Sequence, residues 1–317
     1  MATTPRIAGE EALDEAAEIL RGGGIVAVPT ETVYGLAARA DSDEAVAAIY
    51  RAKGRPSFNP LILHVPDFAA AQALAETDER AAALAEKLWP GALTLVLPRR
   101  CDAGLAPAVS AGLLTIALRC PAHPLMRALL DRCGFPLAAP SANRSGAISP
   151  TEPAHVAASL GDAVPLILDG GRCEAGLEST IVALRGDCRW QILRPGPIDR
   201  ERIAGILGAG NEAVASSGAI EAPGQMASHY APSKPLRLEA EEAATDEFLI
   251  GFGPIGGDAT LSAAGDLAEA AARLYRCLHE ADAAPQPRIA VAPVPQDGIG
   301  AAINDRLRRA AAGYSGS

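Results

Sequence analysis

Aromatic residues are scarce in this 317-residue sequence: they make up 4% of it, although 49% of the residues are hydrophobic. A chain so rich in apolar residues folds around a core, but it offers few rings on which nucleic-acid bases could stack. The sequence also lacks a surplus of positive charge, because its formal net charge is -10 at pH 7. An acidic chain presents no broad surface to nucleic acids or anionic membranes. We therefore expect no membrane partner and no strong direct binding of nucleic acid, although a local basic pocket remains compatible with the composition.

Cysteine pairs and targeting segments are missing as well. The six cysteines contain no CxxC pair and are too few for the disulfide framework of a small secreted protein, so we expect reduced, mostly buried thiols. The N-terminus has neither the basic nor the apolar segment of a signal peptide, and no run of 18 apolar residues occurs. These absences predict a cytoplasmic protein.

The common catalytic signatures are also absent. The sequence contains no P-loop pattern, no HExxH pattern of zinc proteases and no GxSxG pattern of serine hydrolases. A GxGxxG pattern does occur at 251–256, but Pro254 and a polar stretch delay the next helix. A dinucleotide site requires such glycines to open directly into a helix. The chain therefore has no standard nucleotide-binding loop and no obvious covalent nucleophile.

The length of the chain and a change in its composition predict two domains. A single core stops growing at about 250–300 residues. The stretch from about 208 to 235 is rich in Gly, Ser, Ala and Pro and has no apolar periodicity. We expect a larger domain at 1–207, a linker or lid at 208–235 and a smaller domain at 236–317.

Apolar periodicity mixes helices and strands in both domains, which predicts the α/β fold class. In the larger domain, the expected helices span 10–21, 41–53, 67–88 and 122–133. The expected strands span 25–30, 60–65, 93–97, 114–119, 136–139, 164–168, 179–184 and 190–193. The smaller domain follows the order strand, strand, helix, strand, helix at 236–240, 248–254, 267–282, 288–295 and 299–311.

Three cations lie close together in the segment RAKGRPSFNP, which begins at Arg51. The helix dipole favours basic residues at a helix end, so Arg51, Lys53 and Arg55 could simply be solvated. Pro56 and Pro60, however, stop the helix and stiffen the chain after it, which places the cations at a rigid corner suited to phosphates. Only three of the 28 basic residues are lysines. A lysine at this position would supply a compact charge for a phosphate oxygen, although chance placement explains its presence equally well.

Polar clusters follow several of the expected strands. Any one of them could be an ordinary turn, but sites in open α/β sheets lie where strands end. Together, the hydroxyl, glycine and arginine groups predict donors for a phosphate chain and ligands for a hard cation. The clusters are PTETVYG at 29–35, LAAPSANRSGAISPT at 137–151, LDGG at 168–171, LEST at 177–180 and LRPG at 193–196.

Taken in order, the motifs resemble those of the YrdC/Sua5 family of threonylcarbamoyl-AMP synthases. The motifs that carry the resemblance are PTETVYGLA, IYRAKGRPSFNPLILHV, TIALRCPAHP, APSANRSGAISPT, LEST and LRPG, and they cover roughly residues 10–205. The later PGQMASHYAP at 223–232 and the small α/β unit after it resemble the two-domain Sua5 branch. The resemblance implies a YrdC-like twisted mixed sheet with flanking helices and a Rossmann-like C-terminal domain.

The resemblance also implies the reaction. L-threonine, bicarbonate and ATP, with Mg²⁺, would give L-threonylcarbamoyl-AMP and pyrophosphate. A downstream tRNA threonylcarbamoyl transferase machinery would use this product to make N6-threonylcarbamoyladenosine (t6A) at position 37 of tRNA. A carbamate oxygen attacks the α-phosphate, so the protein supplies positioning and charge neutralisation rather than a nucleophile.

Carried over residue by residue, the resemblance implies two groups of ligands. The ATP-binding group is Lys53, Arg55, Asn59, Thr115, Ser141, Asn143, Ser149, Arg194 and Tyr230. The threonine-binding group is Thr30, Thr32, His64, Arg119, Ala139 and Thr180. The catalytic set is Lys53, Arg55, Ser141 and Asn143, of which Ser141 and Asn143 would also meet the metal, mostly through the ATP phosphates. Without the resemblance, the lone His64 after an apolar run is a typical core residue.

Alternatives remain for the role of the connecting segment and for the function of the chain. The resemblance implies that the segment with His229 and Tyr230 folds back over the site as a lid, whereas a plain tether is the alternative. An RNA-binding or ribosome-associated module of the same fold is the main rival function, and acidity weighs against it. A carbamoyltransferase is a second rival, although its usual zinc-finger segments need CxxC pairs.

Overall fold

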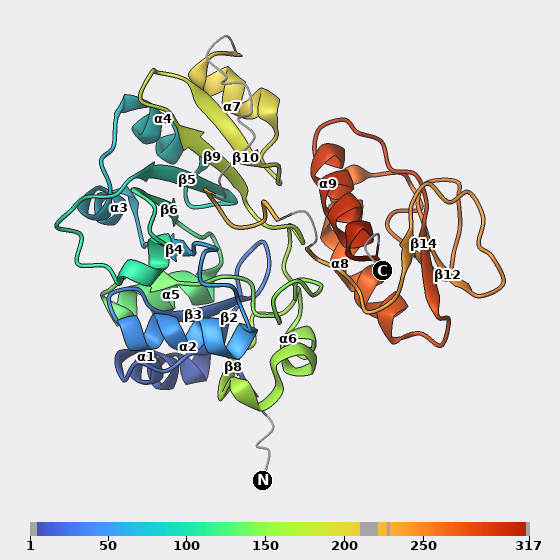
Figure 1. Cartoon of the computed structure of the whole chain (residues 1–317), viewed down its shortest axis with the longest axis horizontal. Helices are drawn as coiled ribbons and strands as arrows, with labels where there is room; N and C mark the ends of the chain where they lie inside the picture. The colour runs from blue at the N-terminus through green and yellow to red at the C-terminus, as the bar shows by residue number, and fades with distance from the viewer. Residues whose placement is uncertain (1–4, 210–220, 227–228, 315–317) are drawn as a thin grey trace.

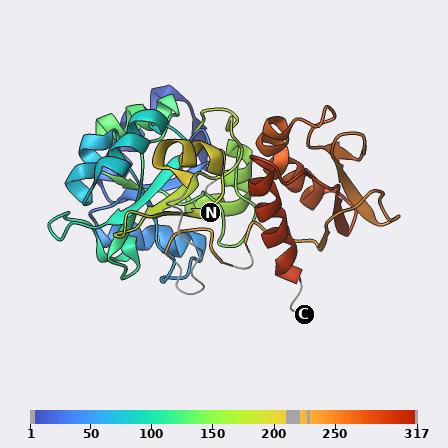
Figure 2. The same ribbon diagram turned by 90° about the horizontal axis from the view of Figure 1, so that it is seen from above.

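The computed structural model describes residues 5–209, 221–226 and 229–314. These form two α/β domains that lie side by side along the long axis of the molecule (Figures 1 and 2). The α/β class and the mixed sheet expected from the sequence are confirmed.

A ten-stranded sheet in the order β1-β8-β2-β3-β7-β4-β6-β5-β9-β10 forms the larger domain. It is mixed, since β4 pairs parallel to β6 but antiparallel to β7. Its strands are β1 (Arg6–Ala8), β2 (Val26–Val28), β3 (Gly35–Arg39), β4 (Ile62–His64), β5 (Leu93–Pro98), β6 (Thr115–Arg119), β7 (Leu137–Ala138), β8 (Leu166–Leu168), β9 (Thr180–Leu184) and β10 (Trp190–Arg194). The helices around it are α1 (Leu13–Arg21), α2 (Asp43–Lys53), α3 (Phe68–Leu74), α4 (Glu79–Leu88), α5 (Pro124–Cys133), α6 (Pro153–Leu160) and α7 (Arg200–Leu207).

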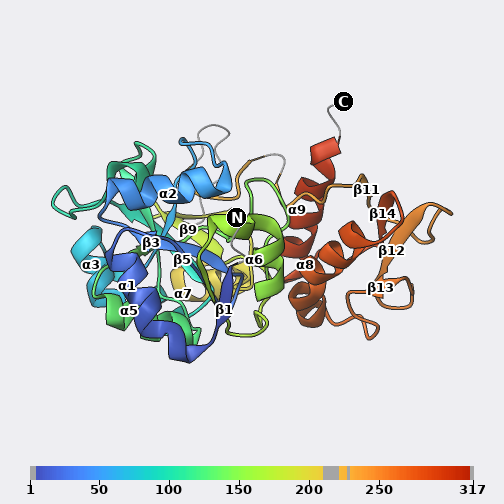
Figure 3. The same ribbon diagram turned by 90° about the horizontal axis from the view of Figure 1, so that it is seen from below.

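The helices divide between the two faces of this sheet, as the apolar clusters show. One face packs against α2, α4 and α7 through Ile49, Leu84 and Ile203. The opposite face is covered over β2 and its neighbours by α1 and α5, whose Leu20 and Leu129 lie in a second cluster. Figure 3 shows α2 and α1 on opposite sides of the sheet.

The rest of that second face, over β4, β6, β5 and β9, is covered differently. Its small apolar cluster includes Ile62, Ala117, Ile181 and Ala183, and the residue packed over them is Ala222 from the chain between the domains. Within the part of the chain that the structure describes, that connecting segment takes the place of a helix here. The candidate functional site lies beneath it.

Helix α2 shows how the local sequence shapes the cationic corner. Ser42 caps its start by accepting a hydrogen bond from the backbone of Ala45, and Gly54 ends it in the left-handed conformation at φ 59°. Glycine adopts that conformation without steric cost. Arg51 is exposed, whereas Lys53 and Arg55 are 3% and 9% exposed. The solvated-surface interpretation therefore holds for Arg51 alone.

The single helix expected at 67–88 is wrong. The structure has α3 and α4 there, with Ala75 extended between them. Asp78 accepts hydrogen bonds from the backbone of Arg80 and Ala81 and so starts a second helix. An aspartate cap competes with continuation of the helix that precedes it.

Several short elements have no counterpart in the sequence prediction. Strand β3 is GLAAR, which lacks the β-branched and aromatic residues typical of strands. Helix α6 begins at Pro153 and helix α7 follows the Asp199 cap, and both residues are readable start signals. Strands β1 and β13 (Ala259–Thr260) span three and two residues, too few for a period to appear.

The C-terminal domain has a four-stranded, all-parallel sheet in the order β11-β14-β12-β13. Its remaining elements are β11 (Leu236–Arg237), β12 (Glu247–Gly251), β14 (Arg288–Val291), α8 (Leu267–Ala283) and α9 (Gly300–Ala311). Parallel strands with crossover helices match the Rossmann-like expectation. Helices α8 and α9 lie between this sheet and the larger domain (Figures 1 and 3).

Among the described residues, no helix combines the length and the apolar character needed to cross a lipid bilayer.

Candidate functional site

A cavity lies between the second face of the large sheet and the connecting segment. Many of the residues singled out in the sequence meet there, although they are far apart along the chain. The predicted residues that line it are Thr30, Thr32, Arg55, His64, Arg119, Ala139, Ser141, Arg194 and Tyr230. The other lining residues are Val33, Gly35, Ile62, Pro140, Glu178, Pro223, Gly224 and His229.

Strand periodicity explains how two of these side chains reach the cavity. Alternate residues of a strand face the same side, so Ile62 and His64 of β4 both line it. On β6, which pairs His64 with Arg119, the small Ala117 occupies the same face and leaves room. The open face therefore presents an imidazole and a guanidinium side by side.

Three buried cations define one end of the site. The Lys53 ammonium donates to the carbonyl oxygens of Ser141 and Asn143 at 2.5 Å each. Arg55 donates to the carbonyls of Asn59 and Pro60, at 3.2 and 2.7 Å. Burial and the neighbouring Arg55 lower the pKa of Lys53 well below its usual value.

Arg194 is the third of these cations and is 4% exposed. Its Nε and Nη2 donate to the Ser179 carbonyl at 3.1 and 2.9 Å, and its Nη1 reaches the Pro223 carbonyl at 3.4 Å. Burial is the main cause that lowers the pKa of Arg194, and burial also lowers the pKa of Arg55 to about 10. In the part of the chain that the structure describes, none of the three forms an ion pair with a carboxylate. Buried cations without a counter-charge are costly unless an anion joins them.

Buried polar atoms without a hydrogen-bond partner gather at the same site. Burying such an atom unpaired costs about 1–3 kcal/mol, so a ligand that pairs them is favoured. Five of the seven described side-chain atoms in this state belong to residues in or beside the cavity: Asn59 Oδ1, His64 Nδ1, Asn143 Oδ1, His229 Nδ1 and Tyr230 Oη. Asn59 also donates to the Met226 sulfur at 3.6 Å, and Asn143 donates to the Ala147 carbonyl at 2.8 Å.

Two threonines occupy the opposite end. The hydroxyl oxygens of Thr30 and Thr32 are 2.9 Å apart, and the Thr30 hydroxyl donates to the Val33 carbonyl at 2.7 Å. That hydroxyl also accepts from the backbone of Thr32 and Val33, at 3.2 Å each. Thr30 therefore shapes the turn, whereas Thr32 has hydrogen-bonding capacity for a ligand.

The Arg119 guanidinium at this end has a carboxylate partner. Its Nη2 donates to Glu31 at 2.7 Å, and the backbone of Ala122 donates to the same carboxylate at 3.0 Å. Burial raises the pKa of Glu31, but Arg119 outweighs it, so the net pKa lies below its ordinary value. Burial, with Arg119 nearby, lowers the pKa of His64 to about 3. His64 is therefore a neutral imidazole at physiological pH.

The connecting segment closes the cavity. Gly224 approaches Arg194 and Tyr230 so closely that a Cβ there would lie 2.7 Å from Arg194 Cδ and 2.8 Å from the Tyr230 hydroxyl. Tyr230 itself has φ 63°, a left-handed conformation that costs a non-glycine residue roughly 1–2 kcal/mol. The cavity volume is about 40 Å³, room for only a few water molecules.

Six predicted residues are absent from the cavity lining. Lys53, Asn59 and Asn143 are immediate neighbours of lining residues, as described above. Ser149 donates to Glu178 at 2.5 Å, and Thr180 exchanges hydrogen bonds with the backbone of Ile198, at 2.7 and 3.0 Å. Thr115 lies at the opposite end of β6 from Arg119. The ligand contacts assigned to all of the predicted residues, those on the lining included, stay predictions.

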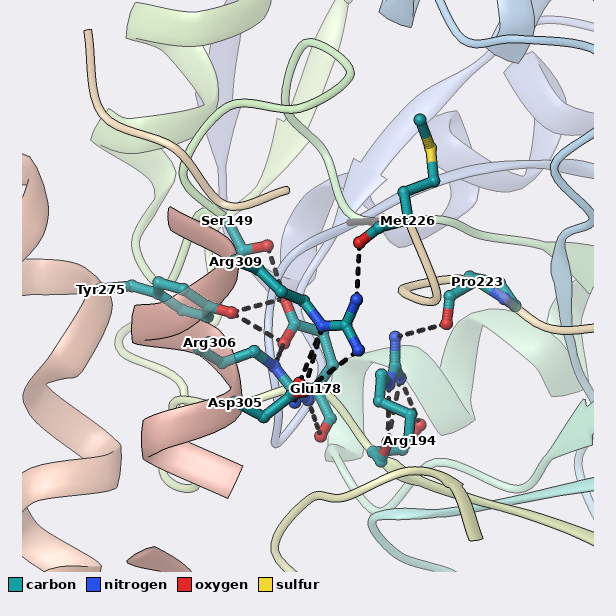
Figure 4. A network of polar contacts seen from close by, with 10 residues as sticks. Ser149, Glu178, Arg194, Pro223, Met226, Tyr275, Asp305, Arg306 and Arg309 are labelled. Carbon is teal, nitrogen blue, oxygen red and sulfur yellow. Dashed lines mark hydrogen bonds and ion pairs between the residues drawn. The ribbon is translucent and has the colours of Figure 1, made fainter. Parts of the chain in front are cut away.

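Glu178 is the principal site residue that the sequence did not single out. It is 6% exposed, lines the cavity and interacts with α8 and α9 of the C-terminal domain (Figure 4). Its position in LEST was quoted in the sequence, but its partners Tyr275 and Arg306 are 97 and 128 residues further along the chain. No local spacing could have indicated that pairing.

Comparison with known proteins gives a consistent result for both domains. The family model described as "Telomere recombination" (Sua5/YciO/YrdC) matches residues 18–196, and the model described as "Threonylcarbamoyl-AMP synthase, C-terminal domain" matches 198–312. The threonylcarbamoyl-AMP synthase of Bacillus subtilis is 41% identical, with 94% of this chain and 92% of the relative covered. That of Pyrococcus abyssi is 37% identical, covering 94% and 93%.

Solved structures agree. The crystal structure of P. abyssi Sua5 complexed with L-threonine aligns with a TM-score of 0.87 at 35% identity and covers 98% of each chain. The structure of Escherichia coli YciO covers 62% of this chain and 96% of its own, with a TM-score of 0.52 at 23% identity, and shares the fold. The likeness extends over both domains only for the first of these two.

Proposed function

Because this chain belongs to the Sua5/YciO/YrdC family of threonylcarbamoyl-AMP synthases, we propose that it forms L-threonylcarbamoyl-AMP and pyrophosphate from L-threonine, bicarbonate and ATP. The observation that carries the proposal is the pairing of two unlike ends in one cavity. One end holds Arg55 and Arg194, with Lys53 beside the lining, and among the described residues none of these three cations forms an ion pair with a carboxylate. The other end holds the hydroxyls of Thr30 and Thr32, the neutral imidazole of His64, and Arg119.

The cationic end suits the phosphate chain of ATP. Lys53 is a compact charge and the two arginines are planar forks, so together they can hold several phosphate oxygens. Attack of a carbamate oxygen on the α-phosphorus breaks its bond to the bridging oxygen, and pyrophosphate leaves. Fixed cations stabilise the charge that builds up on the phosphoryl oxygens without reorganising.

The other end suits L-threonine. Arg119 can hold the substrate carboxylate while Glu31 fixes the guanidinium from behind. Thr32 and the unpartnered nitrogen of His64 offer hydrogen bonds to the substrate hydroxyl or carbamate. Ala139, 5% exposed and beside Gly35 on the lining, leaves space for the substrate methyl group.

Mg²⁺ fits the nucleotide end in one respect. The Asn143 Oδ1 atom is buried and unpartnered, and amide oxygens are ligands that this hard cation accepts. Asn143 and the Ser141 hydroxyl would hold the ion together with ATP phosphates, and the ion would neutralise phosphate charge. The described residues contain no cluster of three or more acidic, His or Cys side chains that would bind a metal alone.

The connecting segment would act as a lid. Its Pro223, Gly224, His229 and Tyr230 line the cavity, whose volume is about 40 Å³, and displacement of the segment would give ATP more room. Closure would exclude water from the mixed anhydride of the product, which hydrolyses readily. The product would then pass to the tRNA threonylcarbamoyl transferase machinery that makes t6A at position 37.

Incubation of the purified protein with ATP, Mg²⁺, threonine and ¹³C-bicarbonate tests the proposal. Mass spectrometry should detect threonylcarbamoyl-AMP carrying the label, and pyrophosphate release should require both threonine and bicarbonate. Serine lacks one methyl group, worth about 1–3 kcal/mol in an apolar subsite, so it should react tens to a few hundred-fold less well. Equal pyrophosphate release without threonine would overturn the assignment.

A further inference from the structure

Arg306 of α9 lies where the two domains and the connecting segment meet. It is 0% exposed. Its Nε donates to Glu178 Oε2 at 2.9 Å, and its Nη1 donates to the neighbouring Asp305 at 2.9 Å. Its guanidinium carbon also lies 5.2 Å from the centre of the Tyr230 ring. One side chain of the C-terminal domain therefore contacts two residues that line the cavity, Glu178 and Tyr230. Figure 4 shows the first of these contacts.

The Glu178 carboxylate is saturated by these contacts. Ser149 donates to Oε1 at 2.5 Å, and Tyr275 of α8 donates to Oε2 at 2.8 Å, beside Arg306. Burial raises the pKa of Glu178, but Arg306 first and Arg194 second outweigh burial and bring it to about 2. Glu178 is thus a charged group whose neutralisation comes mainly from the other domain.

Arg194 is the cation that Glu178 would reach if Arg306 were absent. Arg194 bonds the Ser179 carbonyl, one residue beyond Glu178, and the two side chains line the same cavity. In the present arrangement Arg194 forms no ion pair with Glu178, whose carboxylate accepts hydrogen bonds from Arg306 and Tyr275. An unpaired buried carboxylate attracts any cation within reach, which would withdraw Arg194 from an incoming phosphate.

Tyr230 depends on the same side chain. Its backbone is left-handed at φ 63°, and its hydroxyl is buried without a partner beside Gly224. Such a conformation persists only where surrounding contacts hold it. Here the ring lies over Arg306 and its centre is 5.8 Å from that of Tyr275, so the C-terminal domain directs the hydroxyl into the cavity.

We propose that Arg306 is a positioning residue for the nucleotide site. By occupying Glu178 and supporting the Tyr230 ring, it keeps the Arg194 guanidinium and the Tyr230 hydroxyl directed at the phosphate end of the cavity. The inference rests on the proposed function and deepens it, because it gives the C-terminal domain a part in ATP use beyond anchoring the connecting segment.

The test compares Arg306→Met, Arg306→Lys and the double variant Glu178→Gln/Arg306→Met with the unmodified protein. Arg288→Met is the matched control, since Arg288 forms an exposed ion pair with Asp246 in the same domain at 2.8 Å. The measurements are kcat and KM for ATP and for threonine, and the Kd of α,β-methylene-ATP. Thermal unfolding and small-angle scattering report folding and domain docking.

Arg306→Met should lower kcat/KM for ATP and the affinity for the analogue on the order of 100-fold, the size expected for breaking a buried charge pair. The KM for threonine should change far less, and Arg288→Met should behave as the unmodified protein. Arg306→Lys keeps the charge but not the planar guanidinium, so its kcat/KM for ATP should lie between those of Arg306→Met and the unmodified protein. The double variant should regain at least about tenfold of the loss, because no unpaired carboxylate then competes for Arg194.

A merely structural role predicts other results. In that case the ATP and threonine parameters would fall together, in step with the loss of thermal stability or of docking. The double variant would then be no better than Arg306→Met. Either result overturns the inference. If the unmodified protein makes no threonylcarbamoyl-AMP, the proposed function fails, while the affinities for the ATP analogue still decide the role of Arg306.

Discussion

The two ends of the cavity place similar cations in opposite surroundings. Lys53, Arg55 and Arg194 are held almost entirely by backbone carbonyl oxygens. Arg119, at the other end, donates a hydrogen bond to the Glu31 carboxylate, which also accepts one from the backbone of Ala122. Carbonyl dipoles orient a cation but leave its charge uncompensated, whereas a carboxylate cancels it.

This difference separates the ligands that each end can accept. An uncompensated group of cations favours a polyanion, because each added negative charge gains from all three. A compensated arginine beside neutral hydroxyls and a neutral imidazole favours a small, nearly neutral molecule such as an amino acid. Substitutions at the two ends should therefore affect ATP and threonine separately.

The largest effect is expected from Lys53→Ala or Arg55→Ala. Each removes a buried cation that, under the proposed function, would contact developing phosphoryl charge, which should cost on the order of 2–4 kcal/mol in transition-state stabilisation. Steady-state kinetics should show the loss in kcat/KM for ATP, while calorimetry should find threonine affinity nearly unchanged.

Arg51→Ala is the matched control for these two, because Arg51 belongs to the same corner but is exposed. Its activity should stay close to that of the unmodified protein. Equal, modest losses of activity in all three variants would mean that the cations act through a diffuse electrostatic field and not through positioned contacts. The distinction between the two ends would then be wrong.

Arg119→Met should produce the next largest effect, at the opposite end. It removes the proposed partner of the substrate carboxylate and leaves Glu31 buried without its cation, so threonine affinity should fall about 100-fold. Titration with α,β-methylene-ATP should give nearly the affinity of the unmodified protein. Glu31→Gln leaves Arg119 in place and keeps nearly the shape of the glutamate side chain. This variant should retain more threonine affinity than Arg119→Met. If Arg119→Met lost as much affinity for ATP as for threonine, the two ends would behave as one charged site, and the prediction would be wrong.

Tyr230→Phe, at the cationic end, should have a smaller effect on the use of ATP. The Tyr230 hydroxyl is buried without a partner, so its removal should leave the free energy of unfolding unchanged or slightly higher. A hydrogen bond from this hydroxyl to a phosphate is worth about 1.5 kcal/mol, or roughly tenfold in the KM for ATP. Tyr230→Ala also removes the ring over Arg306 and should cost more. If Tyr230→Phe uses ATP as the unmodified protein does, the hydroxyl does not contact the nucleotide.

The cationic end could be predicted from the sequence because its determinants are local. Ser42, Gly54 and the prolines after Arg55 fix a helix end and a turn, and one segment carries two of the three cations. The helix break at Asp78 was also readable, but apolar periodicity on both sides of it favoured one continuous helix. Strand β3 is different, since GLAAR acquires its extended form only by pairing with β2 and β7.

The threonine end and the domain interface depend on contacts that no spacing reveals. Glu31 and Arg119 pair across 88 residues, and Glu178 and Arg306 across 128. The sequence contains many Asp, Glu and Arg residues, so composition gives no reason to single out these four. Family motifs indicated Arg119, but the carboxylates that hold the two arginines became visible only in the folded chain.

The smallest effect on activity is expected from pH, and it tests whether the threonine end stays neutral. Burial and then Arg119 lower the pKa of His64 to about 3, against 6.5 for an ordinary histidine. His64 should therefore remain uncharged from pH 8 to pH 5, and threonine affinity measured by calorimetry should be flat over that range. A histidine that titrated near pH 6.5 would place a second cation beside Arg119 and change threonine affinity over the same interval.

Stability should respond where affinity does not. The folded pKa of His64 lies below its unfolded value, so the unfolded chain binds the proton first as pH falls. The stability associated with neutral His64 is therefore full above pH 6.5 and declines as pH falls through 6.5 toward 3. By pH 5 the decline amounts to about 2 kcal/mol, from a difference of 1.36 kcal/mol per pKa unit. Urea unfolding of the unmodified protein and of His64→Asn at pH 7.5 and pH 5 isolates this contribution, since the variant should lose less stability on acidification. A variant that loses as much as the unmodified protein would mean that His64 is not held neutral, and the contrast between a charged end and a neutral end would fail.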